Sequence, residues 1–481
     1  MIKVSSDLRL EEGTSIQISA ADPSKSVWVS ANAGTGKTRV LIDRISRLLL
    51  TGTPAHRILC LTFTKAAAAE MANRLNERLG DWAAMREDEI SKALLNLLGR
   101  PATEVEIARA PLLFAETMES PEGLRIRTIH SFCESLLGRF PLESGVAPHF
   151  TVIDERRAAE LREEARDHVL QKAAKSEDTD VSQALSHLAA LVDEDGFARV
   201  MAELDTGKHK LYAMIDSNGG LDALIAAGRQ QLGLELDESR ENVIRDGSKD
   251  NAFDMYALAR AAATLQNGSK TDAERATTLN HWLQLTSKQR AVELVTQYMP
   301  IFLKQNHQPR KTLMTSKPAK ASPEDLEALK AEQKRIFDIS EKLKAITIAE
   351  NTHALLTIGS ALLDTYLSLK KTRALVDYDD LIEKTHNLLG SPTDVSWVHY
   401  KLDGGIDHVL VDEAQDTSPM QWSIIESLAG DFFSSDNRPI KTPRTIFAVG
   451  DEKQSIYSFQ GAEPAQFGNT GEKLHSKAHA A

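Results

Sequence analysis

A lysine and a threonine follow two glycines near the N-terminus, in the run Ala-Asn-Ala-Gly-Thr-Gly-Lys-Thr at residues 31–38. A short apolar segment at 27–29 precedes this run, and apolar residues at helical spacing follow it over 40–50. A strand, a glycine-bearing loop and a helix in this order predict a loop that binds phosphate. Backbone N–H groups of the loop and of the new helix would surround a polyphosphate. The residues expected to bind it are Ala31, Asn32, Ala33, Gly34, Thr35, Gly36, Lys37 and Thr38.

Four of these residues have a chemical role of their own. Gly34 and Gly36 let the backbone approach a phosphate without a Cβ in the way. The Lys37 ammonium would contact the outer phosphates, and the Thr38 hydroxyl would bind Mg²⁺. The usual pattern begins with glycine, where this sequence has Ala31. The alternative is a Gly-Lys-Thr turn that joins a strand to a helix by chance.

Two adjacent acids follow another apolar segment much later in the chain. Residues 406–411 have the pattern of a buried strand, and Asp412 and Glu413 come directly after it. Asp412 would hold Mg²⁺, directly or through water, and Glu413 would take a proton from the water that attacks the γ-phosphate. A strand followed by Asp-Glu is common by itself. Together with the glycine-bearing loop it predicts a nucleotide hydrolase whose two halves meet at the edge of one sheet.

A polar and aromatic stretch follows a further apolar segment at 445–450. Gln454 would contact the γ-phosphate or the attacking water. Tyr457 and Phe459 would stack on bases of a single nucleic-acid strand, at about 1–3 kcal/mol per base. Core packing is the alternative for both aromatic residues, and the sequence context alone favours it for Phe459.

The composition is that of an ordinary globular protein. The chain has 481 residues, of which 42% are apolar and 26% charged, and its length suggests about three domains. A net charge of −12 argues against a basic protein that coats nucleic acid, although a motor can carry a local basic track on an acidic body. The two cysteines lie in apolar surroundings, and neither a signal peptide nor a run of about 18 apolar residues is evident. These features predict a cytoplasmic protein.

The strand patterns predict an α/β fold with a parallel sheet, interrupted by a large helical insertion. Further strands are expected at 57–64 and 125–129, and strand signals become rare between about 154 and 369. The polar C-terminal stretch is expected to be disordered. The expected parts are an α/β domain in two pieces at 1–155 and 371–465, a helical insertion at 156–370, and a disordered tail at 466–481.

Residues 304–323 of the insertion carry five basic residues, three prolines and no acid. This pattern predicts an exposed basic loop. A solvated linker is the favoured interpretation, and a contact with nucleic acid is the alternative.

Five segments, taken in order, resemble the N-terminal motifs of the UvrD/Rep superfamily 1A DNA helicases. They are Ala-Asn-Ala-Gly-Thr-Gly-Lys-Thr at 31–38, Leu-Thr-Phe-Thr-Lys-Ala-Ala-Ala-Ala-Glu-Met at 61–71, Thr-Ile-His-Ser-Phe-Cys at 128–133, Val-Asp-Glu-Ala-Gln-Asp-Thr-Ser-Pro-Met-Gln at 411–421, and Val-Gly-Asp-Glu-Lys-Gln-Ser-Ile-Tyr-Ser-Phe-Gln-Gly-Ala at 449–462. Ala-Ala-Asp-Pro at 20–23 and Trp-Val-Ser at 28–30 resemble the AddA type, the helicase–nuclease subunits of bacterial AddAB complexes for double-strand-break repair.

The resemblance implies a RecA-like P-loop NTPase fold and an ATP-dependent 3′–5′ DNA helicase that acts in repair and recombination. ATP and Mg²⁺ would be its cofactors, and DNA and an AddB-like protein its partners. The resemblance implies that Gln17 recognises adenine, that Arg39 lies against the adenine, and that Gln454 senses the γ-phosphate. The insertion would correspond to subdomain 1B, which contacts duplex DNA. Single-stranded DNA is expected near Phe63, Thr64, Lys65, His130, Tyr457 and Phe459.

The sequence also departs from the family pattern. Gln460 stands where many relatives carry an arginine near the γ-phosphate. We expect the chain to stop before the second motor domain, with its arginine finger, and before the nuclease domain of AddA relatives. A chain that binds ATP and DNA without helicase activity is therefore an alternative. A small-molecule P-loop kinase is a further one, disfavoured by the Asp-Glu-Ala-Gln-Asp run and the aromatic strand ends.

Overall fold

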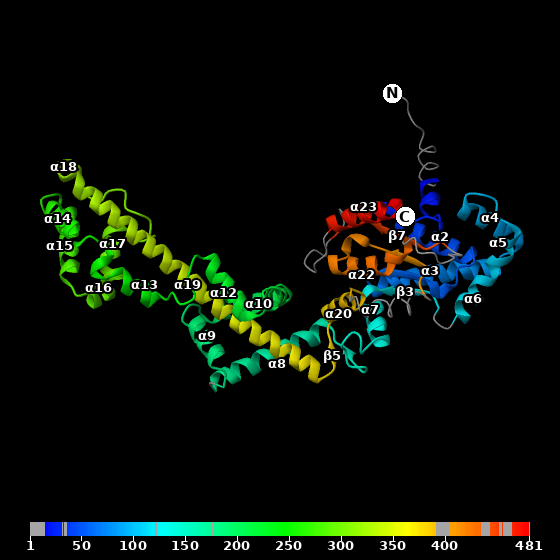
Figure 1. The fold of residues 1–481 in the computed structure, drawn as a ribbon. Helices are drawn as coiled ribbons and strands as arrows, with labels where there is room; N and C mark the ends of the chain where they lie inside the picture. The colour runs from blue at the N-terminus through cyan, green and yellow to red at the C-terminus, as the bar shows by residue number, and fades with distance from the viewer. Residues whose placement is uncertain are drawn as a thin grey trace, which may run out of the picture. The chain divides into compact units, whose positions relative to one another are not determined.

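The computed structural model describes residues 15–30, 32, 36–120, 123–175, 177–390, 405–433, 443–451, 455 and 464–480. The chain divides into two compact units, one made of Met1–Ala158 with Lys370–Ala481 and the other of Ala159–Leu369 (Figure 1). The sequence places its domain boundaries after residues 155 and 370. Every residue predicted to bind nucleotide or single-stranded DNA belongs to the first unit.

A five-stranded parallel sheet forms the centre of the first unit, with the strand order β1-β7-β6-β2-β3. This arrangement confirms the predicted α/β class. It also interleaves strands that precede the second unit in the chain with strands that follow it. The strands are β1 Val27–Ser30, β2 Ile58–Thr62, β3 Arg125–Thr128, β6 His408–Val411 and β7 Thr445–Gly450.

Helices cover both faces of this sheet (Figure 1). Leu59 and Leu61 of β2 share a core with α7, α20 and α22, whereas Cys60 between them shares a core with α2 and α3. Burial on both faces explains why β2, β6 and β7, the three inner strands, are predominantly apolar. The helices of the unit are α2 Lys37–Leu50, α3 Lys65–Ala84, α4 Glu87–Leu98, α5 Glu104–Arg109, α6 Leu113–Glu119, α7 Ile129–Arg139, α20 Tyr378–Gly390, α22 Pro419–Ala429 and α23 Pro464–Ala480.

A second, two-stranded sheet joins the places where the chain leaves and re-enters the first unit. Strands β4 Thr151–Val152 and β5 Leu375–Val376 pair in parallel, with Thr151 opposite Leu375. This pairing holds the two crossing segments together, so a long insertion is compatible with an intact sheet.

Helices build the second unit, as the sequence predicts. Helix α19 has 50 residues and is about 75 Å long at 1.5 Å per residue. Its residues Ile336 and Ile346 share a core with α15, where Trp282 stacks on Tyr298 at a ring-centroid distance of 3.6 Å. No helix among the described residues combines the length and apolarity needed to cross a membrane. The helices are α8 Glu155–Ala174, α9 Thr179–Ala189, α10 Glu194–Thr206, α11 Lys208–Ser217, α12 Leu221–Gln231, α13 Arg240–Gly247, α14 Met255–Gln266, α15 Lys270–Gln284, α16 Ser287–Glu293, α17 Met299–Phe302, α18 Ser316–Ala321 and α19 Pro323–Thr372.

The basic segment at 304–323 is more ordered than a simple loop. Leu303 and Pro309 form an isolated antiparallel bridge, and helix α18 lies within the segment. Leu313 and Met314 are buried in the core of the second unit. The sequence prediction considers only charges and prolines and therefore misses this apolar pair. Burial of the pair packs the segment against the helices. The lysines on it are exposed at positions 304, 311, 317 and 320.

The predicted disorder of the C-terminal stretch is wrong, because residues 466–480 belong to helix α23. Phe467, Thr470 and Leu474 recur at helical spacing and are buried. Phe467 stacks on Trp28 of β1 with ring centroids 4.9 Å apart. Small and polar residues between these positions conceal the apolar stripe in the sequence.

Replacing Phe467 by alanine should lower the free energy of unfolding by about 3 kcal/mol, because it leaves a cavity beside Trp28. The matched control is Lys473→Ala on the same helix, which removes an ion pair with Glu426 from a half-exposed side chain. The control should cost less than about 1 kcal/mol. Urea unfolding measures both changes, and equal losses would contradict the docking of α23.

Candidate active site

The N-terminus of α2 is open to an anion. The helix begins at Lys37, directly after Gly36, whose φ of +84° lies in the left-handed region that favours glycine. Among the described residues no side chain caps this end, and no acid occupies the first turn. The N–H groups of the first turn have no partner within the helix, and such groups are suited to binding an anion.

The two predicted halves of the site are in contact. The Nζ atom of Lys37 lies 2.9 Å from Oε2 of Glu413, although the two residues are 376 positions apart in the chain. The Lys37 side chain is 10% exposed and that of Glu413 is 40% exposed, so solvent reaches the pair from the carboxylate side.

The register of the sheet explains this contact. Ser30 at the end of β1 pairs with Gly450 at the end of β7, and Val411 at the end of β6 pairs with Ala448. The carboxyl ends of the three strands therefore lie side by side. Ligands of open α/β sheets bind at this edge.

A hydrogen-bonded bridge orients Glu413. Gln415 donates from Nε2 to Oε2 of Glu413 at 2.8 Å, and its Oε1 accepts from the N–H of Asp451 at 2.8 Å. Gly450 leaves room for this bridge, because a Cβ there would lie 2.7 Å from Oε1 of Gln415. Glu413 itself has a φ of +48°, which is strained for a residue with a Cβ. The bridge thus joins Glu413 to the segment that follows β7.

Asp412 has the features of a carboxylate that could hold a cation. It is 7% exposed, and its Oδ1 atom is buried without a hydrogen-bond partner among the described residues. Burial and the neighbouring charge of Glu413 raise the pKa of this carboxyl from 3.8 to about 6. A buried oxygen without a partner fits Mg²⁺, which prefers oxygen ligands and would neutralise phosphate charge. Asp412 and the hydroxyl of Thr38, in the first turn of α2, are the residues that would hold it.

The two residues assigned to adenine lie near the start of α2. The Nε2 atom of Gln17 is 3.4 Å from the position that a Cβ on Gly36 would take, so this amide borders the loop. Arg39 is 69% exposed, with its Nε atom 3.9 Å from Oδ2 of Asp43. Asn32 is exposed as well.

Three residues assigned to single-stranded DNA follow β2 directly. Phe63 is half-buried, and Thr64 and Lys65 are exposed. The Thr64 hydroxyl also caps α3 by accepting from the N–H of Ala67. Two of the three side chains therefore face solvent at the edge of the sheet that carries Glu413.

His130 comes from the neighbouring strand end, at the start of α7. Its ring contacts the ring of Tyr378 edge-on, with centroids 5.2 Å apart. Burial lowers the pKa of His130, and the charge of Asp379 partly offsets the effect. Thr128 at the end of β3 pairs with Thr62 at the end of β2, which brings His130 and Phe63 to the same edge.

Several assigned residues lie outside the described part of the chain, and their roles stay predictions. They are Ala31, Ala33, Gly34, Thr35, Gln454, Tyr457, Phe459 and Gln460.

Sequence reasoning missed the residues that hold the site in position. Gln415 belongs to the Asp-Glu-Ala-Gln-Asp run but receives no separate role from the pattern. Arg44 and Arg47 of α2 are 0% and 6% exposed, three positions apart within the apolar stripe of that helix. Charged residues on the apolar side of an amphipathic helix are the signal that would have found them.

Replacing Asp412 by asparagine should stabilise the protein at neutral pH in the absence of Mg²⁺ and nucleotide. The unfolded carboxyl loses its proton near pH 3.8, whereas the native carboxyl keeps it up to about pH 6. The stability of the wild type therefore falls as the pH rises through this window, and that of the neutral amide does not.

In urea unfolding, the advantage of Asp412→Asn should be near zero at about pH 4 and should reach about 2–3 kcal/mol at about pH 7. An advantage that does not change with pH would contradict a buried carboxyl with a raised pKa.

Comparison with known proteins gives the family. The profile of the UvrD/REP helicase N-terminal domain matches residues 13–475. Relatives whose names describe one subunit of an ATP-dependent helicase/nuclease are 26% identical in Lactobacillus gasseri, 26% in Enterococcus faecalis and 28% in Desulforudis audaxviator. These matches cover 93%, 93% and 92% of this chain but 36%, 34% and 35% of the relatives, so the chain spans about a third of their length. Because the family profile covers almost all of its residues, the chain belongs to the UvrD/REP helicase family and contains the N-terminal domain of that family.

Proposed function

We propose that the chain is the ATP-binding part of a DNA motor of AddA type, which moves 3′ to 5′ along one strand and acts in double-strand-break repair. The contact between Lys37 and Glu413 at one sheet edge carries the proposal, because an ATPase needs both groups at one phosphate. The relatives are named for a combined helicase and nuclease, which supports the AddA type. Their description as one subunit of that enzyme supports an AddB-like partner.

The geometry supports a simple order of events at the phosphates. The γ-phosphate of ATP would compete with Glu413 for the Lys37 ammonium. Binding would therefore release the Glu413 carboxylate, which is then able to accept a proton from the attacking water. Gln415 would keep the carboxylate directed at the phosphate while this exchange takes place.

The proposed DNA path runs along the ends of β2 and β3. Leu61 of β2 pairs with Val411 of β6, so the segment with Phe63 and Lys65 is one strand away from Glu413. An aromatic ring, a cation and a histidine at one edge suit stacking on bases and contact with phosphates. The short distance along the sheet offers a route by which DNA changes the ATP site.

A second candidate is a module that binds ATP and DNA without unwinding. The observation that favours it is that the groups assigned to both ligands lie at one sheet edge, within a match that spans about 36% of the relatives. The 481 residues by themselves would then bind both ligands but show little DNA-stimulated hydrolysis.

Two substitutions in the 481-residue chain distinguish binding from catalysis. Lys37→Ala should remove ATP binding. Glu413→Gln should keep ATP binding but reduce any hydrolysis by about 100-fold or more, the usual effect of a lost general base. Calorimetry measures binding, and phosphate release with and without single-stranded DNA measures turnover.

Retained hydrolysis in Glu413→Gln would refute the role of Glu413 as the base. Binding without DNA-stimulated turnover in the wild type would favour the second candidate. Unchanged ATP binding in Lys37→Ala would refute the nucleotide site itself.

A contact between the second unit and duplex DNA is also proposed, through the exposed lysines at 304–320. Lys311 is a suitable probe, because Arg310 already donates from Nε to the carbonyl of Pro300 at 3.0 Å. Lys311→Glu should weaken duplex binding and lower the slope of log affinity against log salt by about 1. Lys288→Glu, an equal charge change at another exposed lysine of the unit, is the control. Equal salt slopes for the two variants would contradict the DNA contact and favour the interpretation of the segment as a linker.

A further inference from the structure

The segment that carries Gln17 is held by two buried arginines of α2. Residues 15–20 form a helical turn before β1. Arg47 donates from one terminal nitrogen to the carbonyl of Ile18 at 2.8 Å, and Arg44 donates to the carbonyl of Asp22 at 2.5 Å. Helix α2 thus presents Lys37 at its N-terminus and holds the Gln17 segment with its buried side.

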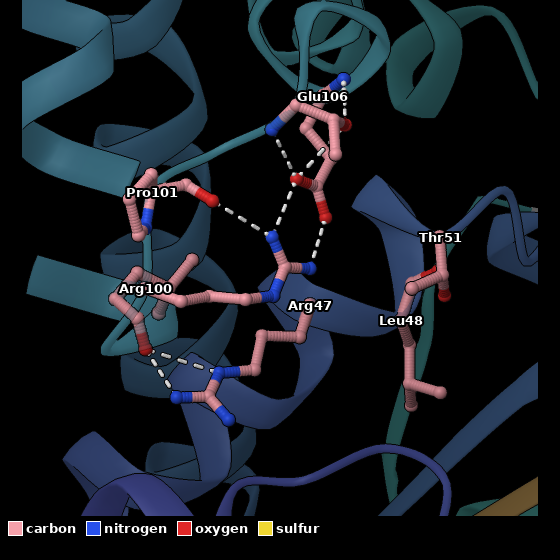
Figure 2. Close-up of polar contacts among 8 residues, drawn as sticks. Arg47, Leu48, Thr51, Arg100, Pro101 and Glu106 are labelled. Carbon is pink, nitrogen blue, oxygen red and sulfur yellow. Dashed lines mark hydrogen bonds and ion pairs between the residues drawn. The ribbon is translucent and has the colours of Figure 1, made fainter. Parts of the chain in front are cut away.

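Arg47 also binds a third element, the end of α4. Its Nε atom donates to the carbonyl of Leu97 at 3.1 Å, and a terminal nitrogen donates to the same oxygen (Figure 2). One guanidinium therefore joins α2, the end of α4 and the backbone next to Gln17. Guanidinium groups suit this role because their five donors have fixed directions.

The side chain of Ile18 makes a second contact with the end of α4. Gly99 ends that helix with a φ of +70°, and a Cβ on it would lie 3.0 Å from Cγ2 of Ile18. Glycine at this position lets Ile18 lie against the turn. The residue beside Gln17 is thus fixed through its carbonyl by Arg47 and through its side chain by Gly99.

The turn after α4 is closed by its own ion pair. Arg100 lies beside Arg47 in Figure 2 and makes two contacts with Glu106, at 3.0 and 2.7 Å. Glu106 also accepts from the N–H of Thr103 at 2.8 Å and caps α5. The contact with Arg100, aided by Thr103, lowers the pKa of Glu106 to about 2. Glu106 thereby neutralises Arg100, so the guanidinium of Arg47 stays directed at the two carbonyls.

We propose that Arg47 and the turn after α4 position Gln17 against the base of the nucleotide, and thereby set the preference of the site for adenine. The inference deepens the proposed function and rests on it. A glutamine amide distinguishes adenine from guanine by the placement of one donor and one acceptor, so a small displacement weakens both hydrogen bonds. The contacts expected between Lys37 and the triphosphate do not depend on the hydrogen bonds of Arg47. Arg47 is therefore a positioning residue and has no contact with the nucleotide.

The test compares ATP, GTP and tripolyphosphate, each with Mg²⁺, on the 481-residue chain by calorimetry. Arg47→Met keeps the length and the apolar stem of the side chain but removes its donors. The ratio of ATP affinity to GTP affinity should fall about tenfold, the scale of one weakened hydrogen bond, while tripolyphosphate binding stays unchanged.

Two further variants separate positioning from general stability. Arg109→Met is the matched control, because Arg109 also donates from Nε to a backbone carbonyl at the C-terminal end of α2, that of Leu49, at 3.0 Å. It should lower the melting temperature without changing the ratio. Gly99→Ala leaves Arg47 intact but crowds Ile18, and it should lower the ratio as Arg47→Met does. In a Gln17→Ala background, Arg47→Met should have no further effect on the ratio.

An unchanged ratio in folded Arg47→Met or Gly99→Ala would overturn the inference. Equal loss of ATP and tripolyphosphate binding in Arg47→Met would overturn it as well, because that result indicates a general structural role. Equal affinity of the wild type for ATP and GTP would refute base recognition while leaving the ATP site in place. No ATP binding by the wild type would refute the proposed function itself.

Discussion

The ion pair between Lys37 and Glu413 requires one particular arrangement of the first unit. The two side chains meet only if β1 and β6 run in parallel and end at the same edge of one sheet. The chain must therefore return to this sheet after it has passed through the whole second unit. The pairing of β4 with β5 joins the two crossing segments, so the insertion leaves the register of the central strands intact.

The same site is locally unfavourable for folding. Glu413 adopts a positive φ, and Asp412 is buried beside it with a raised pKa and an oxygen without a partner among the described residues. Such strain persists only where many contacts of the surrounding structure fix the strained residues. Two apolar cores, one on each face of the sheet, provide those surroundings, together with the hydrogen bonds of Gln415. In the proposed function, this cost in stability is the expected consequence of holding a nucleotide and a cation at one place.

The fold and the positions of the candidate catalytic groups were largely predictable, because local sequence patterns carry them. The apolar run at 58–61 and the Asp-Glu pair after 406–411 each identify their element without tertiary information. The supporting contacts were not predictable, since Arg47 reaches Leu97 and Ile18 through the tertiary structure. Helix α23 was missed because its apolar stripe is sparse, and the packing of Phe467 on Trp28 decides its structure.

In the proposed function, Lys37 and Asp412 hold one magnesium nucleotide at a shared sheet edge. Calorimetric titration of ATP with and without Mg²⁺, on the wild type and on Asp412→Asn, tests it most directly. We predict that Mg²⁺ raises the ATP affinity of the wild type and has little effect on that of the variant. An equal effect of Mg²⁺ on both proteins would show that Asp412 and the loop do not share a ligand, and would contradict a common site.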